Sequence, residues 1–209
     1  MSIIEKLQWR YATKKFNPEI KLSEAKLTTL KEAFNLTALS YGLQTIKLVI
    51  VEDKNTREEL LGLSYGQRQV VDSSHLLVLC IQSNIDTTDV NEHFETIKDV
   101  RNTPDAVLES FKNQLTSTIE NMPSEKKVSW ATKQAYIALG NLMTVCAVEG
   151  IDACPMEGFS PTELDKVLEL DQHGLNSVLM LPVGYRAEDD MFADFKKVRK
   201  SLSKTIIEL

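Results

Sequence analysis

The sequence has little cysteine and no long apolar run, and each scarcity excludes a class of protein. Its three cysteines, Cys80, Cys146 and Cys154, are an odd number in apolar segments without the spacing of a metal site, so we expect buried reduced thiols and no metal. The longest apolar runs, 76–81 and 178–181, are too short to cross a bilayer, and no signal-peptide pattern opens the chain. We therefore expect a cytoplasmic protein without a membrane segment.

Positive charge is also in short supply, with 24 lysines and arginines against 30 acidic residues and a formal net charge of −6. That balance, together with an aromatic content of 7%, argues against nucleic-acid binding. The 209 residues are 43% apolar, which is enough to bury a core, and no linker or internal repeat divides them. We expect a single domain over residues 1–209.

The basic residues that are present form two clusters near opposite ends of the chain. Residues 10–15 contain one arginine and two lysines, and residues 196–200 contain three lysines and one arginine. Either cluster alone is more often a solvated or dipole-stabilising helix end. Two such clusters on an acidic chain indicate a small, specific anion, and phosphate is the natural candidate.

Hydrophobic periodicity and capping signals predict helices interleaved with a few strands. Residues 86–125 carry nine acidic and three basic residues and are predicted to be a solvated helical excursion. The chain ends in a β-prone tail, Thr205 to Glu208, which has no obvious partner strand in its own chain. We expect helices from Ser2 to about Arg10, from Ser23, from Thr103-Pro104, from Ser124 to Gly150 and from Ser160-Pro161, and strands at 46–52, 75–82, 151–155 and 176–184.

No nucleophile–base pair emerges from the sequence. His75 opens a buried strand and is interpreted as structural, while His93 and His173 have no partner that marks a catalytic dyad. The segment 155–159 joins a predicted strand to a predicted helix, which is where backbone amides can face a ligand. We expect no catalytic side chain, a pattern typical of enzymes whose cofactor performs the chemistry.

Six short motifs, in a fixed order and spacing, carry a family resemblance. They are Arg10–Lys14, Ser40–Gln44, Gly66–Gln69, Lys133–Tyr136, Pro155–Phe159 and Lys197–Arg199. Each is weak alone, but the six in register resemble the oxygen-insensitive NAD(P)H nitroreductase family, which includes dihydropteridine reductase-like members. The resemblance runs from about the second residue to the last.

The resemblance implies an α+β, nitroreductase-like fold with a central mixed β-sheet wrapped by helices. It also implies an obligate homodimer in which the C-terminal strand is exchanged and two FMN molecules lie at the interface. The exchanged strand would be the tail, Thr205 to Glu208, and residues 86–125 would lie beside the open face of the flavin and shape the substrate pocket.

The resemblance implies that Arg10, Lys197 and Arg199 bind the FMN phosphate. A phosphate carries roughly two negative charges, and guanidinium groups suit it because they bind bidentately. Lys14 is expected near the pyrimidine edge of the ring, where positive charge stabilises the anion formed on reduction. Many members have a phosphate-binding serine at the position of Ala12, so the basic residues carry more of that task here.

The resemblance places other residues around the flavin ring. Gln67 and Gln69 supply amide groups suited to the O2, N3 and O4 edge. The backbone amide of Glu157 is expected near N5, and Gly158 lets the backbone approach the ring. Ser40–Gly42 would come from the partner subunit. The full set of implied cofactor-binding residues is Arg10, Tyr11, Ala12, Lys14, Ser40, Tyr41, Gly42, Gln67, Gln69, Pro155, Met156, Glu157, Gly158, Lys197 and Arg199.

The function predicted from this resemblance is an FMN-dependent oxidoreductase that uses NADH or NADPH. It would reduce small-molecule acceptors, nitroaromatics or quinones, by ping-pong hydride transfer through flavin N5. A dihydropteridine or flavin reductase is an alternative that shares the cofactor. A protein that stores, degrades or senses FMN without turnover is a second alternative, and a structural protein without a cofactor is a third.

Gln134 and Asn141 are interpreted as core polar groups bonded to backbone.

Overall fold

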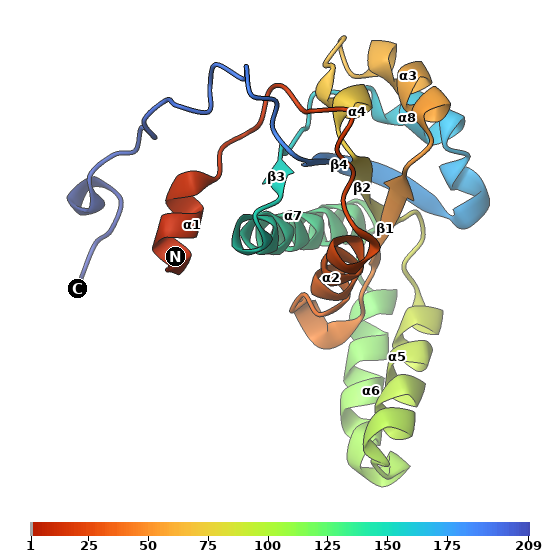
Figure 1. Cartoon of the computed structure of the whole chain (residues 1–209). Coiled ribbons are helices and arrows are strands. Elements are labelled where there is room, and N and C mark those ends of the chain that lie inside the picture. The colour runs from red at the N-terminus through yellow and green to blue at the C-terminus, as the bar shows by residue number, and fades with distance from the viewer. Residues whose placement is uncertain (1) are drawn as a thin grey trace.

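Four antiparallel strands form the centre of the computed structural model, which describes residues 2–209 (Figure 1). They lie in the order β1-β2-β4-β3, and β2 and β4, the two longest strands, are central. Parallel pairing in the described residues is limited to an isolated bridge between Ala12 and Ala153. The predicted α+β class is confirmed. The resemblance implied a mixed sheet, but the four strands pair antiparallel and the Ala12–Ala153 bridge is the parallel contact of the described residues. The strands are β1 (Ile46–Val51), β2 (His75–Gln82), β3 (Asp152–Ala153) and β4 (Leu175–Gly184).

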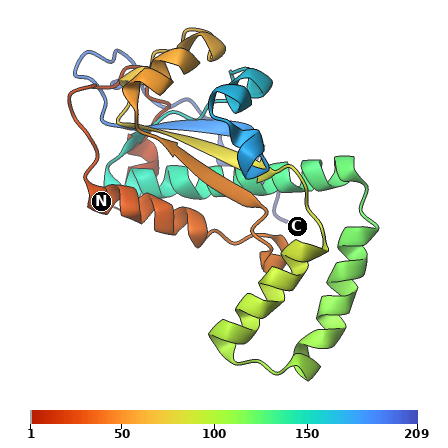
Figure 2. The same cartoon turned by 90° about the vertical axis from the view of Figure 1, so that its right-hand side faces the viewer.

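Helices cover both faces of the sheet, because successive residues of β2 point to opposite sides. Leu77 and Leu79 pack in the cluster that includes α2 and α7, whereas Leu76 and Val78 pack in the cluster that includes α3 and α8 (Figure 2). The sequence of β2 is therefore a continuous apolar run. The helices are α1 (Ile3–Trp9), α2 (Glu24–Asn35), α3 (Lys54–Leu63), α4 (Gln69–Asp72), α5 (Thr87–Arg101), α6 (Asp105–Glu120), α7 (Ser124–Glu149) and α8 (Pro161–Val167), with short 3-10 turns at Ser40–Gly42, Leu170–His173 and Leu202–Lys204.

The start and stop signals read from the sequence match most helix ends. Ser2 and Ser23 cap α1 and α2, and Ser2 forms the predicted capping box with Glu5. Helix α7 ends at Gly150, whose φ of +66° is the left-handed conformation that favours glycine. Helix α6 begins one residue later than predicted, because Pro104 occupies the N-cap and not the first helical position.

Residues 86–125 form a helical hairpin, α5 and α6, that projects from the body of the protein (Figures 1 and 2). The predicted excursion is confirmed as helical. It is less solvated than its charge indicates, because Phe94 and Leu115 are 1% exposed and Val90 and Ile119 are fully buried. An acidic outer surface and a buried apolar seam share the same two helices.

Helix α1 and the C-terminal segment lie together at one side of the molecule, away from the sheet (Figure 1). No residue of α1 is buried, and every residue from Asp194 to Leu209 is exposed. Within one chain, the tail forms a short 3-10 turn at Leu202–Lys204 and pairs with no strand of the described residues. Strand exchange between subunits stays a prediction.

Among residues 2–209, no helix has both the length and the apolar character needed to span a bilayer. Cys80, Cys146 and Cys154 are buried and unbonded, as predicted, and burial raises the pKa of each thiol. The described part of the chain contains no group of three or more histidine, cysteine or acidic side chains arranged to hold a metal ion.

Candidate functional site

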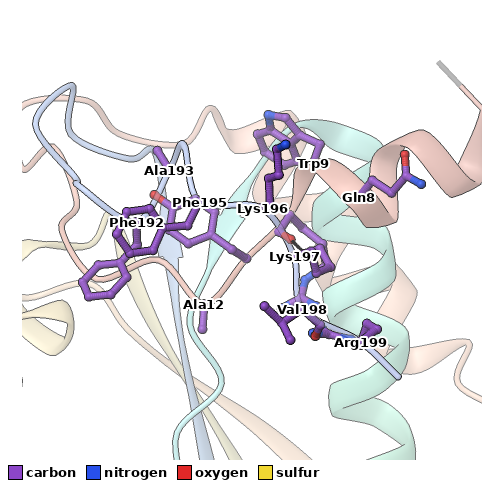
Figure 3. Close-up of a pocket in the computed structure, with 12 residues that line it drawn as sticks. Gln8, Trp9, Ala12, Phe192, Ala193, Phe195, Lys196, Lys197, Val198 and Arg199 are labelled. Carbon is purple, nitrogen blue, oxygen red and sulfur yellow. Dashed lines mark hydrogen bonds between the residues drawn. The ribbon is translucent and has the colours of Figure 1, made fainter. Parts of the chain in front are cut away.

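Arg10 of the first basic cluster and Lys197 of the second, 187 residues apart, line one pocket, whose second wall is drawn in Figure 3. Residues 8–12, at the end of α1 and just after it, form one wall, and residues 192, 193 and 195–199 form the other. The pocket has a volume of about 370 Å³, and Ala12, Lys197 and Arg199 all contribute to its lining. Arg10 also lines it, so the pocket contains the three basic residues that the resemblance assigns to a phosphate, Arg10, Lys197 and Arg199.

No ion pair compensates the positive charge of this basic pocket in the part of the chain that the structure describes. In residues 2–209, no carboxylate lies within ion-pair distance of Arg10, Lys197 or Arg199. Lys197 Nζ donates to the Arg10 carbonyl, and Arg199 donates to the Val198 carbonyl at 2.6 Å. Burial and the nearby Arg199 charge lower the pKa of Arg10, while burial, Arg10 and Arg199 lower the pKa of Lys197. An anion placed among these groups relieves their mutual repulsion.

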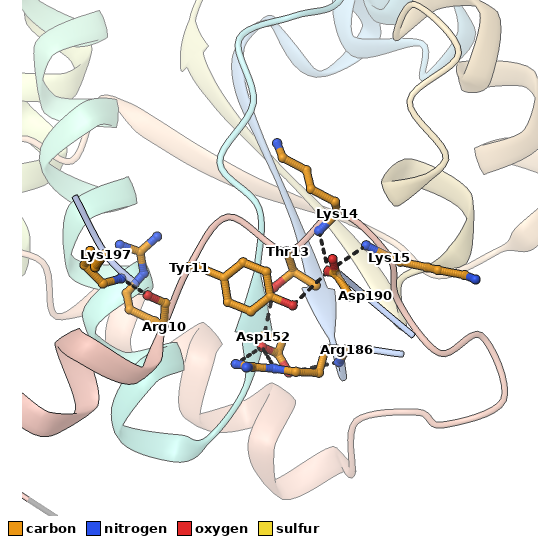
Figure 4. A network of polar contacts seen from close by, with 9 residues as sticks. All are labelled: Arg10, Tyr11, Thr13, Lys14, Lys15, Asp152, Arg186, Asp190 and Lys197. Atoms are coloured by element: carbon orange, nitrogen blue, oxygen red, sulfur yellow. Dashed lines mark hydrogen bonds and ion pairs between the residues drawn. The ribbon is translucent and has the colours of Figure 1, made fainter. Parts of the chain in front are cut away.

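A buried ion pair supports the first wall of the basic pocket. Arg186 donates to Asp152 through Nε at 2.8 Å and through its backbone amide at 2.9 Å, and its terminal nitrogen lies 2.6 Å from Oδ1 (Figure 4). The rings of Trp9 and Tyr11 lie 4.4 and 4.6 Å from the Arg186 guanidinium carbon. These contacts attach the chain on both sides of Arg10 to the segment that follows β4.

The segment that carries Lys14 runs beside the segment that carries Glu157. Ala12 bridges Ala153, and the Thr13 amide donates to the Ala153 carbonyl at 3.3 Å. The Lys14 ammonium extends away from the pocket's supporting carboxylates (Figure 4), and its charge opposes the rise that burial causes in the pKa of Cys154. Lys14 is therefore close to the start of the 155–158 loop.

Residues 155–158 form a loop that is fixed on β4 and leaves two amides free. Met156 and Met180 exchange backbone hydrogen bonds of 2.8 and 3.0 Å, which anchors the loop to the sheet. Within the described chain, the Glu157 and Gly158 amides donate no hydrogen bond. The Glu157 carboxylate instead accepts from the Tyr136 hydroxyl on α7. The two amides are available to a ligand.

Gln67 lies against the same loop. Its Nε2 donates to the Gly158 carbonyl at 3.0 Å, and a Cβ added at Gly158 would lie 3.0 Å from that nitrogen. Gly66, with a φ of +70°, makes the turn that brings Gln67 there. Gln69 follows in α4 and is buried, 7% exposed. The structure thus joins Gln67 to the 155–158 loop, whereas Gln69 makes no hydrogen bond to that loop among the described residues.

Ser40–Gly42 lies elsewhere in the chain and does not line the basic pocket. The Ser40 amide donates to Gln134 Oε1 at 2.9 Å, and the rings of Tyr41 and Trp130 have centroids 6.1 Å apart. A Cβ at Gly42 would lie 2.7 Å from a carbon of His93. Within one chain this segment therefore lies against α5 and α7 and not in the pocket that Arg10 lines.

The sequence predicts that the side-chain amides of Asn141 and Gln134 are core polar groups bonded to backbone. The structure confirms this for Asn141 and in part for Gln134. Asn141 donates to the Ala33 carbonyl at 2.8 Å and to the Thr37 hydroxyl at 3.0 Å. Gln134 is 1% exposed and accepts a backbone bond through Oε1, but its Nε2 has no partner in the described residues. His75 is buried with Nδ1 2.9 Å from the Ser74 hydroxyl, which fits the structural role predicted for it.

Sequence reasoning missed three residues that build the site. Asp152, Arg186 and Asp190 support the basic pocket, yet they lie in no motif that the chain shares with a known pattern. The adjacent acidic pair at 189–190, just before the second basic cluster, was the available signal, and it resembles ordinary surface charge.

The fold and the site define an α+β protein with two features: a cationic pocket with no ion pair among the described residues, and a 155–158 loop with two amides that donate no hydrogen bond there. Residues 7–185 match the model of the Nitroreductase family, and the chain belongs to that family. A Staphylococcus haemolyticus protein named as a putative NAD(P)H nitroreductase is 36% identical over 199 residues, which are 90% of each chain.

Solved structures show the same fold. A nitroreductase-like protein from Streptococcus mutans superposes with a TM-score of 0.86 at 23% identity, covering 99% of this chain and 97% of that one. An Exiguobacterium sibiricum protein named as a putative nitroreductase, solved in complex with FMN, superposes with a TM-score of 0.83 at 17% identity, covering 100% of this chain and 98% of that one.

Proposed function

We propose that the chain is an FMN-dependent oxidoreductase that uses NADH or NADPH to reduce nitroaromatic, quinone or related acceptors in a ping-pong cycle. Bound FMN supplies hydride transfer at N5, so the protein needs no catalytic side chain. The nitroreductase name of the S. haemolyticus relative and the FMN complex of the E. sibiricum protein support this assignment.

The uncompensated charge of the basic pocket is the observation that carries the proposal. Three cations, Arg10, Lys197 and Arg199, converge, and no carboxylate of the described residues lies within ion-pair distance of them. The chain as a whole has a net charge of −6. A terminal phosphate offers them acceptor oxygens for charge-assisted hydrogen bonds. Ala12 adds no hydroxyl to the pocket, so the cations carry the binding.

The 155–158 loop supplies the groups suited to the ring. The free amides of Glu157 and Gly158 can donate to flavin N5, and Gly158 keeps the approach clear because a Cβ there would crowd Gln67. Lys14 brings positive charge to the same side of the sheet, where it stabilises a reduced, anionic ring. These residues bind and orient the cofactor and perform no bond-breaking step themselves.

A homodimer completes the site in this proposal. Strand β1 is an edge strand, and a groove of about 400 Å³ beside it is lined by Phe34, Leu48 and Ile50. The tail exposes 52% of Ile206 and 85% of Ile207, and exposed apolar side chains on a β-prone segment suit a sheet edge of a second copy. Ser40–Gly42, remote from the pocket within one chain, would cover the cofactor of the partner subunit.

We expect the purified protein to be yellow and to contain non-covalent FMN, not FAD. The pocket collects its cations at one point, which suits a terminal monophosphate, and the sequence has no G-x-G-x-x-G turn for a dinucleotide pyrophosphate. Flavin released by heat should co-migrate with FMN on chromatography. Predominant FAD, or a colourless protein that does not bind added FMN, would contradict the proposal.

A further inference from the structure

Asp190 is a buried carboxylate at the point where the chain leaves the body of the protein for its C-terminal segment. It is 4% exposed, whereas all residues from Asp194 to Leu209 are exposed. Its Oδ2 accepts hydrogen bonds from the Tyr11 hydroxyl at 2.8 Å and from the amides of Lys14 and Lys15 at 2.9 and 3.0 Å (Figure 4). Three donors of the first basic segment therefore meet one oxygen.

The second oxygen of Asp190 holds the other segment. Its Oδ1 accepts from the Phe192 amide at 3.1 Å, and the Asp190 carbonyl accepts from the Ala193 amide at 3.0 Å. Residues 192–199 then run along the basic pocket and include Lys197 and Arg199. One side chain thus joins the two walls of the pocket.

The ionised form of Asp190 is the form that these contacts favour. Burial acts to raise its pKa, but the hydrogen bonds donated by Lys15, Tyr11, Phe192 and Lys14 outweigh burial and lower it. The carboxylate is therefore ionised at neutral pH, with both oxygens in use as acceptors. Its neighbour Asp189 is exposed and pairs only with the Lys15 ammonium on the surface.

We propose that Asp190 is a positioning residue for the phosphate: it fixes the Arg10 segment against the Lys197–Arg199 segment, so that the pocket exists before the ligand enters. The inference deepens the proposed function and rests on it. Preorganised donors bind an anion more tightly than the same donors on a loose segment, because less ordering is required on binding.

Position and charge make opposite predictions for the removal of this carboxylate. If Asp190 acted only through its charge, neutralising it would raise the local positive potential and strengthen the binding of an anion. If it positions the two segments, Asp190→Asn weakens binding, because an amide nitrogen then faces either Phe192 or the three donors of the first segment. The sign of the change separates the two roles.

The test compares the affinities of FMN and riboflavin, which differ by the phosphate, for the apoproteins of the parent, Asp190→Asn and Asp189→Asn. We expect Asp190→Asn to bind FMN about tenfold more weakly and riboflavin as the parent does. Asp189→Asn removes the same charge from the adjacent exposed position and should retain the parent's affinity for both ligands. Unaltered or stronger FMN binding by Asp190→Asn would overturn the inference.

Asp190→Glu is the second variant if Asp190→Asn does not fold, because it keeps the charge and both acceptor oxygens on a longer arm. We expect it to lose part of the preference for FMN over riboflavin, and an intact preference would overturn the inference. In whichever variant folds, backbone amide hydrogen exchange should be faster than in the parent at residues 11–15 and 190–199, and unchanged elsewhere. A parent protein that binds FMN no better than riboflavin would overturn the phosphate pocket itself, a failure distinct from that of Asp190.

Discussion

Arg199→Ala is expected to bind FMN roughly tenfold to a hundredfold more weakly than the parent protein. The guanidinium lines the basic pocket and has no carboxylate partner in the described chain, so its hydrogen-bonding capacity is available to a phosphate. Charge-assisted bonds of this kind contribute about 1.5–3 kcal/mol each. Fluorescence titration of the apoprotein with FMN measures the change.

Lys200→Ala is the matched control. It removes a positive charge at the next residue in the chain, and the Lys200 side chain does not line the pocket. It should titrate with FMN nearly as the parent does. In Arg199→Ala saturated with FMN, reduction by the nicotinamide should be much less affected than affinity, because the phosphate is remote from N5. Parent-like FMN affinity of Arg199→Ala would rule out its role in the pocket.

Deletion of residues 204–209 is expected to lower the melting temperature and weaken FMN retention together. The removed segment contains Ile206 and Ile207, which are exposed within one chain and which we assign to the β1 edge of a second copy. The segment also follows Lys197 and Arg199 directly, so loss of its docking loosens the basic pocket. Melting curves with and without added FMN measure both effects.

A full-length variant with Ile206 and Ile207 replaced by asparagine should reproduce the deletion, because it removes the apolar contacts and keeps the chain length. Glu208→Gln is its control, as it alters the tail without removing apolar surface. A truncated protein with the parent's dimer mass, melting temperature and flavin occupancy would show that the tail is an ordinary frayed terminus.

Local signals in the sequence were enough to predict most of the fold. Ser2 and Ser23 are N-caps and Gly150 is a left-handed C-cap, and each depends on neighbours within a few residues. Strand β2 was predicted with its observed ends because an apolar run of six residues, 76–81, bounded by His75 and Gln82 has few other structures available. The convergence of Arg10 with Arg199 came from the family resemblance, not from local pattern.

The remainder depends on contacts between distant residues, which one sequence does not reveal. Asp190 accepts bonds from residues more than 170 positions away, and Asp152 pairs with Arg186 across 34 positions. Nothing near either aspartate distinguishes it from surface charge. The antiparallel pairing of all four strands was missed for the same reason, since strand direction follows from the path of the whole chain.

The solvent exposure of the α5–α6 hairpin was misjudged because composition averages over the faces of a helix. Nine acidic residues in 86–125 suggest full solvation, yet Phe94 and Leu115 occupy one face of each helix and are buried. The hairpin buries an apolar seam and exposes its charges. The spacing of apolar residues along each helix indicates which face is buried, whereas a count of charged residues does not.

Anaerobic stopped-flow mixing of the FMN-loaded protein with NADH or NADPH, followed by a nitroaromatic or quinone acceptor, tests the central claim most directly. The account predicts that at least one nicotinamide rapidly bleaches the flavin absorbance and that the acceptor then restores it. A protein that binds FMN through the basic pocket but stays oxidised with both nicotinamides would contradict the assignment, and would show that the chain stores or senses FMN without turnover.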